Sequence, residues 1–277
     1  MSVKKEPSGR RSVQVEVEVP GTPEEVWRAI ATGPGISSWF VPTRSEERQG
    51  GEVISTFGPG MDSPATITVW EPLKRFVAEG NMGGPGSPAV ATEWTVEARA
   101  GGKCLVRVVH SLFASTDDWD NQLDGLEQGW PAIFRILRRR LETFRGMESS
   151  AMQFVTFASD PAAKAWEKLG GELGLLNVAE GQKWSTPASP SGLPRMTGTS
   201  MGHGMTPSTV LLVLDAPPGG APGTAYIGVF PCGGMGMVYM AIYLYGPNAK
   251  AAVERDEPIW QKWMDERFPA PPMPQGG

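Results

Sequence analysis

The stretch that decides the fold covers residues 117–145 and reads DDWDNQLDGLEQGWPAIFRILRRRLETFR. Its apolar residues recur at spacings of three and four, which places them on one face of a helix. These residues are Leu126, Trp130, Ile133, Phe134, Leu137, Leu141 and Phe144. Everything before the helix reads as short strands. We therefore expect a curved antiparallel sheet wrapped around this helix, enclosing a cavity in which function is located.

The residues upstream supply the strands and two short helices. Residues 12–19 alternate between valine and polar residues, as in a half-buried strand. Thr22-Pro23-Glu24-Glu25 predicts a helix start with a capping box, and a second helical turn leads to Trp39 and Phe40. Further strands are expected at 51–57, 65–71, 75–80, 90–98 and 103–113. Pro131 predicts that the long helix either starts near that residue or is kinked there.

The same order of elements restarts after Gly146. We expect a strand at 153–157, a helix after Pro161, a loop at 181–193, strands at 196–201, 209–215, 224–230 and 237–244, and a closing helix at 248–268. This order predicts an internal duplication. The domains are placed at 12–146 and 151–268, the second copy being divergent, and residues 1–11 and 269–277 are expected to be flexible tails.

Composition excludes several classes of protein. The chain has 277 residues, a formal net charge of −5 and a pI of about 5.3, which argues against non-specific binding of nucleic acid. The two cysteines do not indicate a disulfide framework, and no signal peptide or run of about 18 apolar residues is recognisable. We expect a cytoplasmic protein without a membrane span.

Several motifs of the first half occur in an order that resembles a known family. They are TPEEVW at 22–27, WF at 39–40, TITVWEP at 66–72, TEWTV at 92–96 and DGLEQGW at 124–130. Together they resemble the SRPBCC (START/Bet v 1-like) superfamily, in its branch named after the activator of Hsp90 ATPase homologue. The resemblance covers residues 12–146, and for residues 151–268 it rests on element order.

The resemblance implies an α+β helix-grip fold, in which an antiparallel sheet of about six or seven strands grips a long C-terminal helix around a pocket. Members of the superfamily typically bind hydrophobic small molecules, and some are cyclases, hydrolases or resistance proteins. The family name by itself carries little evidence that this chain activates Hsp90.

The residues suggest no catalytic, metal or cofactor site. His110 alternates with apolar residues on the last strand, and its interpretations are a cavity acid or base or a hydrogen-bonded core histidine. His203 lies in a turn-like Gly-His-Gly. The two histidines and two cysteines do not form a metal-binding set. Asp117, Asp118 and Asp120 are interpreted as charge at a helix N-terminus.

The aromatic residues provide the candidate ligand-binding site, since an apolar cavity with a few polar groups is the usual small-molecule site. In the first copy they are, with one histidine, Trp39, Phe40, Trp70, Trp94, His110, Phe113, Trp130 and Phe134. In the second copy the candidates are Met201, Met205, Met235, Met237, Met240, Tyr243 and Trp260.

Three functions remain open at this point. The main hypothesis is binding of a hydrophobic or amphipathic small molecule, with the N-terminal copy holding it. The alternative is a cyclase- or hydrolase-type enzyme that uses a cavity residue such as His110. A third is a protein-interaction or co-chaperone-like module, with a protein partner or a homodimer.

Overall fold

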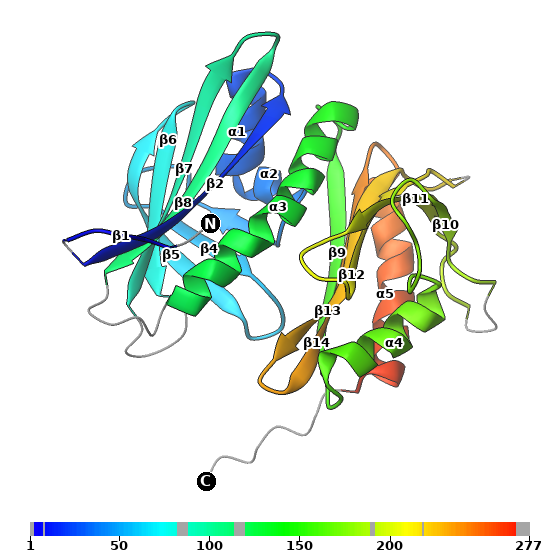
Figure 1. The fold of residues 1–277 in the computed structure, drawn as a ribbon. Coiled ribbons are helices and arrows are strands. Elements are labelled where there is room, and N and C mark those ends of the chain that lie inside the picture. The colour runs from blue at the N-terminus through cyan, green and yellow to red at the C-terminus, as the bar shows by residue number, and fades with distance from the viewer. Residues whose placement is uncertain are drawn as a thin grey trace. The chain divides into compact units, whose positions relative to one another are not determined.

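The computed structural model describes residues 3–7, 9–81, 88–113, 120–188, 192–217 and 219–269, and the chain divides into two compact units, Met1–Gly146 and Met147–Gly277 (Figure 1). Each unit contains its own antiparallel sheet and its own long C-terminal helix. The predicted loop around residues 83–88 and the acidic residues Asp117 and Asp118 fall largely or wholly outside the described residues.

The described sheet of the N-terminal unit has the strand order β1-β2-β8-β7-β6-β5-β4-β3, and each neighbouring pair is antiparallel. Its elements are β1 Lys4–Lys5, β2 Arg10–Pro20, α1 Pro23–Ala31, α2 Gly33–Ser37, β3 Thr43–Ser45, β4 Glu52–Thr56, β5 Asp62–Glu71, β6 Arg75–Asn81, β7 Ala89–Arg99, β8 Lys103–Phe113 and α3 Asp120–Thr143. The five strands predicted after residue 50 are all present, whereas the short strand β3 was not expected.

Local sequence explains where α1 begins. The Thr22 hydroxyl accepts a hydrogen bond from the Glu25 amide, and the Glu25 carboxylate accepts one from the Thr22 amide at 2.9 Å. Pro23 occupies the first helical position, where no amide proton is needed. The predicted capping box is therefore confirmed.

The long helix α3 is the central element of this unit and lies along β2 (Figure 1). It is already helical at Asp120 and continues through Pro131, so of the two predicted alternatives the one in which the helix starts near Pro131 is excluded. Its predicted apolar face is buried at Trp130, Phe134 and Leu137, while Leu126 is only partly buried. Ile136 is fully buried as well, so the apolar face is wider than the spacing indicated.

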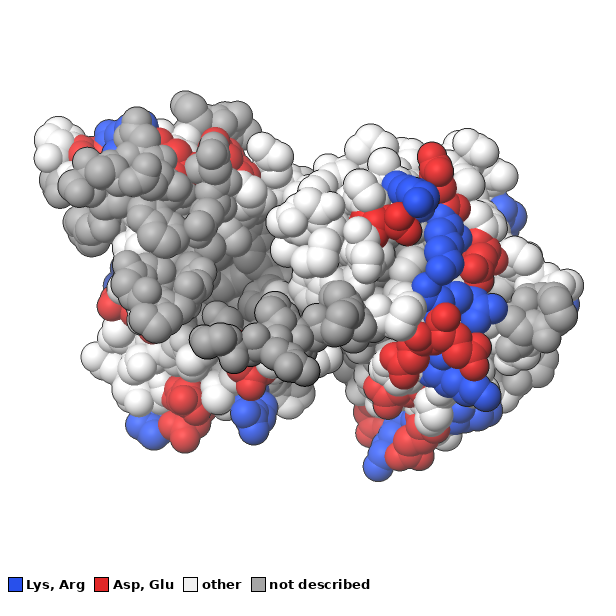
Figure 2. All heavy atoms as spheres, turned by 90° about the horizontal axis from the view of Figure 1, so that it is seen from below, with Lys and Arg blue, Asp and Glu red and all other residues white. Residues whose placement is uncertain are grey.

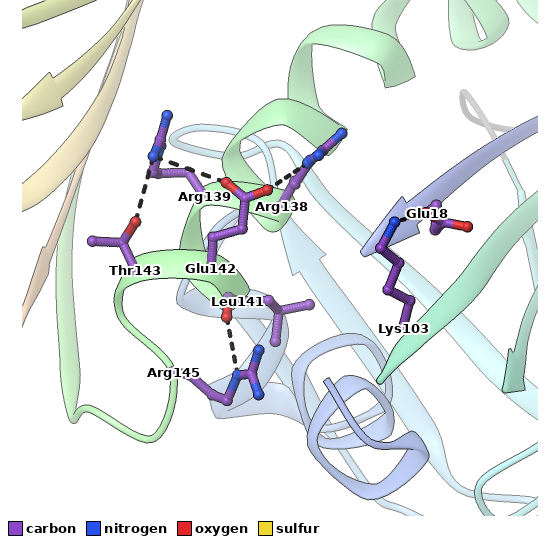
Figure 3. Close-up of polar contacts among 8 residues, drawn as sticks. All are labelled: Glu18, Lys103, Arg138, Arg139, Leu141, Glu142, Thr143 and Arg145. Carbon is purple, nitrogen blue, oxygen red and sulfur yellow. Dashed lines mark hydrogen bonds and ion pairs between the residues drawn. The ribbon is translucent and has the colours of Figure 1, made fainter. Parts of the chain in front are cut away.

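The charged face of α3 carries short-range ion pairs (Figure 3). Arg138 contacts Glu142 at 2.6 Å, and its side chain is 57% exposed. Arg139 contacts the same carboxylate at 3.8 Å. Exposed pairs of this kind contribute about 0–1 kcal/mol each. Arg139 and Arg140 are only partly exposed, and Arg140 donates a hydrogen bond to the buried Ser38 hydroxyl at 3.4 Å.

The N-terminal segment, for which the sequence predicts a flexible tail, contains the short strand β1 among its described residues. β1 pairs with β2, and both strands reach the first turn of α3. Lys5 Nζ lies 2.8 Å and Arg11 Nη1 lies 2.6 Å from the two carboxylate oxygens of Asp120. These contacts join residues that are more than 100 positions apart in the sequence. Residues 270–277 of the predicted C-terminal tail lie outside the described part.

The C-terminal unit has the described strand order β10-β11-β12-β13-β14-β9, again antiparallel throughout. Its elements are β9 Ser149–Ala158, α4 Ala162–Leu173, β10 Lys183–Ser185, β11 Thr197–His203, β12 Thr209–Leu214, β13 Gly223–Cys232, β14 Met235–Tyr245 and α5 Ala249–Arg267. The short strand β10 interrupts the segment that was expected to be a loop. Pro258 lies inside α5, as Pro131 lies inside α3.

The two units share one connectivity. In each, the first long strand pairs with the last strand, and the remaining strands follow in reverse sequence order. Helices come after the first strand and after the last one. This is the predicted α+β helix-grip fold in two copies. The second copy diverges in having fewer strands and one helix, α4, where the first has α1 and α2.

On the face that Figure 2 draws, Lys and Arg side chains are interleaved with Asp and Glu side chains. In the C-terminal unit, Arg267 of α5 pairs with Glu172 of α4. None of the described helices combines the length and the apolar character that crossing a membrane requires.

The capping box gives a first prediction. Thr22→Ala removes one acceptor from the α1 N-terminus and should lower the free energy of unfolding by about 1 kcal/mol, because the amide of Glu25 loses its partner. Urea denaturation of the full chain, followed by tryptophan fluorescence, measures this change. Thr22→Ser keeps the hydroxyl and should behave like the wild type. Equal loss in both variants would mean that the cap does not stabilise α1.

Candidate functional site

The face of the sheet toward α3 is built from rows of residues set by strand register. One row crosses β5, β6, β7, β8 and β2 as Ile67, Ala78, Thr92, His110 and Val13. Because side chains in register point to the same face, these five lie side by side. Four members of this row are apolar or hydroxyl-bearing, and His110 is its one imidazole.

His110 has both ring nitrogens occupied by other side chains. Its Nε2 lies 2.7 Å from Trp130 Nε1, and its Nδ1 lies 3.0 Å from Thr92 Oγ1. An indole N–H can only donate, so Nε2 must be the unprotonated acceptor. The neutral ring therefore carries its proton on Nδ1 and donates it to Thr92. Burial lowers the pKa of His110 to about 4, so the imidazole is uncharged at neutral pH.

Trp130 is the centre of an aromatic cluster. Its ring centroid lies 5.1 Å from that of Trp94, 5.2 Å from Phe134 and 5.3 Å from Phe40. The His110 ring stacks on it at 5.7 Å with an interplanar angle of 17°. Most of these contacts are tilted or edge-to-face, the arrangements that aromatic quadrupoles favour. The cluster thus joins α3, β7, β8 and the residues after α2.

The remaining predicted residues occupy the margins. Trp39 is fully buried, donates its indole N–H to the Ala29 carbonyl at 2.8 Å and stacks on Phe40. Trp70 is separated from the cluster by Phe76, which it contacts at 5.8 Å. The side chain of Phe113 lies outside the described part of the chain. The structure therefore brings Trp39, Phe40, Trp94, His110, Trp130 and Phe134 together and leaves Trp70 at the edge.

Two further parts of this site escaped the sequence reading. Thr92, the partner of His110, alternates with Trp94 along β7, and this alternation is the signal that could have identified it. Phe57, at the end of β4, is 39% exposed and contacts Phe40 at 5.8 Å. The aromatic cluster therefore extends to the surface. Phe57 ends the strand predicted at 51–57 and precedes Gly58-Pro59-Gly60, and nothing in its spacing links it to Phe40.

Small residues lie beside the aromatic cluster on the same face. Ala65 and Gly80 are register partners in the row next to that of His110. A Cβ atom at Gly80 would stand 2.4 Å from the Pro64 carbonyl oxygen, so only glycine fits there. Phe40, Ala65 and Thr92 remain partly exposed although they belong to the face toward α3. This face therefore combines bulky aromatic walls with a floor of small side chains.

Residues 20–142 match the family model described as Activator of Hsp90 ATPase homolog 1-like protein. The match lies within the N-terminal unit. The match confirms the resemblance carried by the motifs, and this unit is called the AHSA1-like unit below. No curated protein matches the chain significantly.

Several solved structures are similar to the chain. The di-domain ARO/CYC BexL from the BE-7585A biosynthetic pathway is 14% identical with a TM-score of 0.46, the alignment covering 95% of this chain and 100% of BexL. DynU16, from the dynemicin biosynthetic locus, is 17% identical with a TM-score of 0.42, over 91% and 98% of the two chains. MLL2253 from Mesorhizobium loti is 22% identical with a TM-score of 0.44, over 48% and 97%.

A surface hollow of about 310 Å³ in the AHSA1-like unit lies away from the aromatic cluster. It is lined by Glu52, Thr66 and Glu79, which are register partners on the opposite face of the sheet, and also by Ala65 and Gly80. None of the residues predicted for the ligand site lines it. Within the described residues, no group of three or more His, Cys, Asp or Glu side chains is arranged to hold a metal ion.

The predicted set in the second copy is divided between two faces. Met240 and Trp260 belong to the core between the sheet and α5. Tyr243 and Met237 alternate with Met240 along β14 and therefore point to the opposite face. Met205 is 37% exposed. These residues do not form one pocket, because the sequence reading grouped residues of odd and even positions on the same strand.

The buried histidine gives a second prediction. The unfolded imidazole titrates near 6.5 whereas folded His110 titrates near 4, so only the unfolded state binds this proton between those values. The contribution of His110 should therefore lower the free energy of unfolding by about 1.4 kcal/mol per pH unit as the pH falls from about 6.5 to about 4. Since the chain has two histidines, His203→Gln leaves a single imidazole for an NMR titration.

In that titration the His110 signal should stay in its neutral position from pH 8 down to about pH 5. The pH dependence of the unfolding free energy should become shallower between pH 6.5 and 5 in His110→Gln. A midpoint near 6.5 would contradict the neutral, doubly hydrogen-bonded imidazole.

Proposed function

We propose that the AHSA1-like unit binds a hydrophobic or amphipathic small molecule between α3 and the inner face of its sheet. The observation that carries the proposal is the aromatic cluster around Trp130, which faces small residues and extends to the surface at Phe57. Apolar walls with a few polar groups are what a small-molecule site requires. The site would be formed by Trp39, Phe40, Trp94, His110, Trp130 and Phe134, with Trp70 at its edge.

Thr92 supplies the polar group that would orient such a ligand. Its oxygen accepts the proton of His110 Nδ1, so its own hydroxyl proton remains available for an acceptor on the ligand. Thr92 is partly exposed, unlike His110, which is 6% exposed. We infer an amphipathic ligand that places rings against the aromatic wall and one oxygen near Thr92.

Binding without catalysis is favoured over a cyclase or hydrolase that uses His110. A general base needs a free nitrogen within reach of the substrate. In His110, Nε2 is taken by Trp130 and Nδ1 by Thr92. The histidine would therefore act as a positioning residue for Trp130 and Thr92.

We further propose that the protein acts in a reducing compartment such as the cytoplasm. The free thiols of Cys104 and Cys232 are consistent with such a compartment.

Native mass spectrometry of the full-length chain, with organic extraction, tests the proposal first. A co-purifying apolar compound in near-stoichiometric amount is the expected result. If the chain is obtained free of ligand, thermal shifts against a library of apolar and amphipathic ring compounds replace this readout. No bound compound and no thermal shift would contradict the proposal.

A matched pair of variants locates the site. Ala78→Leu adds a bulky side chain in the row of His110 and should weaken binding of the compound found above by more than tenfold, because it narrows the space between the sheet and α3. Glu79→Leu places a leucine on the neighbouring residue, which lines the outer hollow, and should leave binding intact. The reverse result would place the ligand in the outer hollow instead. Circular dichroism checks that both variants fold.

A further inference from the structure

The C-terminal unit contains a hollow of about 230 Å³ between α5 and the sheet. Its floor is apolar and buried, and it is formed by Met152, Leu214, Ile242, Leu244, Ala252 and Trp260. The volume exceeds the roughly 150 Å³ of a cavity that holds benzene. It lies below the roughly 300 Å³ at which typical ligand pockets begin. One ring, or two small ones, with a short substituent would fit.

Trp260 gives this floor an unused hydrogen-bond donor. The side chain is fully buried, and Nε1 has no hydrogen-bond partner among the residues that the structure describes. The buried indoles of Trp39, Trp130 and Trp184 each donate to a protein acceptor. A buried donor without an acceptor is rare in native proteins, and a bound molecule is one of its ordinary explanations. The hollow therefore combines an apolar surface with a hydrogen-bond donor, Trp260 Nε1–H, that a ligand oxygen could satisfy.

The charges at the mouth decide which acceptor fits. Arg255 is held by Asp256 through two contacts of 2.7 Å, and Arg195 and Asp215 at the rim also cancel in formal charge. The floor itself carries no cation. A carboxylate buried against Trp260 would remain an uncompensated charge, which is costly in an apolar site. An uncharged carbonyl oxygen meets the donor without this cost.

We propose that the hollow under α5 is a second ligand site, which takes a small uncharged ring compound whose carbonyl oxygen accepts a hydrogen bond from Trp260 Nε1–H. This site is separate in residues and in ligand chemistry from the one proposed for the AHSA1-like unit. The two proposals can therefore fail independently.

The test uses two probes of nearly equal shape, acetophenone and α-methylstyrene, which differ in having C=O or C=CH2. Binding to the full-length chain is followed through the indole N–H signals in 15N NMR, with Trp260→Phe identifying the signal of Trp260. Acetophenone should shift that signal downfield. It should bind about threefold to tenfold more tightly than α-methylstyrene, since one neutral hydrogen bond separates them.

Two sets of variants complete the test. In Trp260→Phe the two probes should bind equally, because the donor is absent. Ala252→Leu fills the hollow and should abolish the response, whereas Ala251→Leu on the exposed side of the same helix should not. A Trp260 signal that neither probe moves would overturn the proposal, as would binding that survives Ala252→Leu. Ala78→Leu in the other unit should leave this response unchanged.

Discussion

The hydrogen bond from Trp130 to His110 is the constraint on which the interior of the AHSA1-like unit depends. It joins α3 to β8 across the apolar core at 2.7 Å. Because the indole only donates, the imidazole must stay neutral and must keep its proton on Nδ1, which then engages Thr92 on β7. Breaking this chain at either end leaves a buried polar group unpaired, at a cost of about 1–3 kcal/mol. The position of the long helix over the sheet is thus fixed by polar contacts as well as by apolar packing.

The same chain of hydrogen bonds shapes what the interior can bind. Both ring nitrogens of His110 are engaged, Nε2 by Trp130 and Nδ1 by Thr92. The hydroxyl proton of Thr92 is then the polar group that remains for a ligand. The rest of the wall is aromatic, with Trp94 edge-to-face and Phe40 tilted against Trp130. A site with one polar group and several aromatic faces selects rings over charges. This is why binding of an apolar or amphipathic molecule follows more directly than acid–base chemistry.

Most of the fold could be predicted from the sequence, because its signals are local. Valine alternation marked β2, the capping box marked α1, and the spacing from Trp130 to Phe144 marked α3. The features that escaped prediction depend on distant partners. Strand β1 consists of two lysines without apolar alternation, and its ion-pair partner Asp120 is more than 100 residues away in the sequence. β3 and β10 are too short for any alternation to be seen.

The sequence predicted which residue types form the candidate site but not which of them are hydrogen-bonded to each other. Aromatic residues near strand and helix motifs identified Trp94, Trp130 and Phe134, and alternation along β8 put His110 on the inner face. Which nitrogen of His110 meets which neighbour depends on register between strands, and this information is not local. In the second copy the same reasoning failed, because methionines and tyrosines of one strand were grouped without separating its two faces.

Comparison of the two copies explains why Trp260 differs from Trp130. Both tryptophans lie on the C-terminal helix of their unit. Helix α3 packs on β2, and α5 packs on β9 and β14. On β8 the inner face presents His110 as an acceptor for Trp130. On β14, the counterpart of β8, the inner positions are Val238, Met240, Ile242 and Leu244, which are all apolar. The second copy therefore has a buried indole on its helix whose N–H has no acceptor among the described residues. A ligand oxygen would accept from Trp260 as His110 accepts from Trp130 in the first copy.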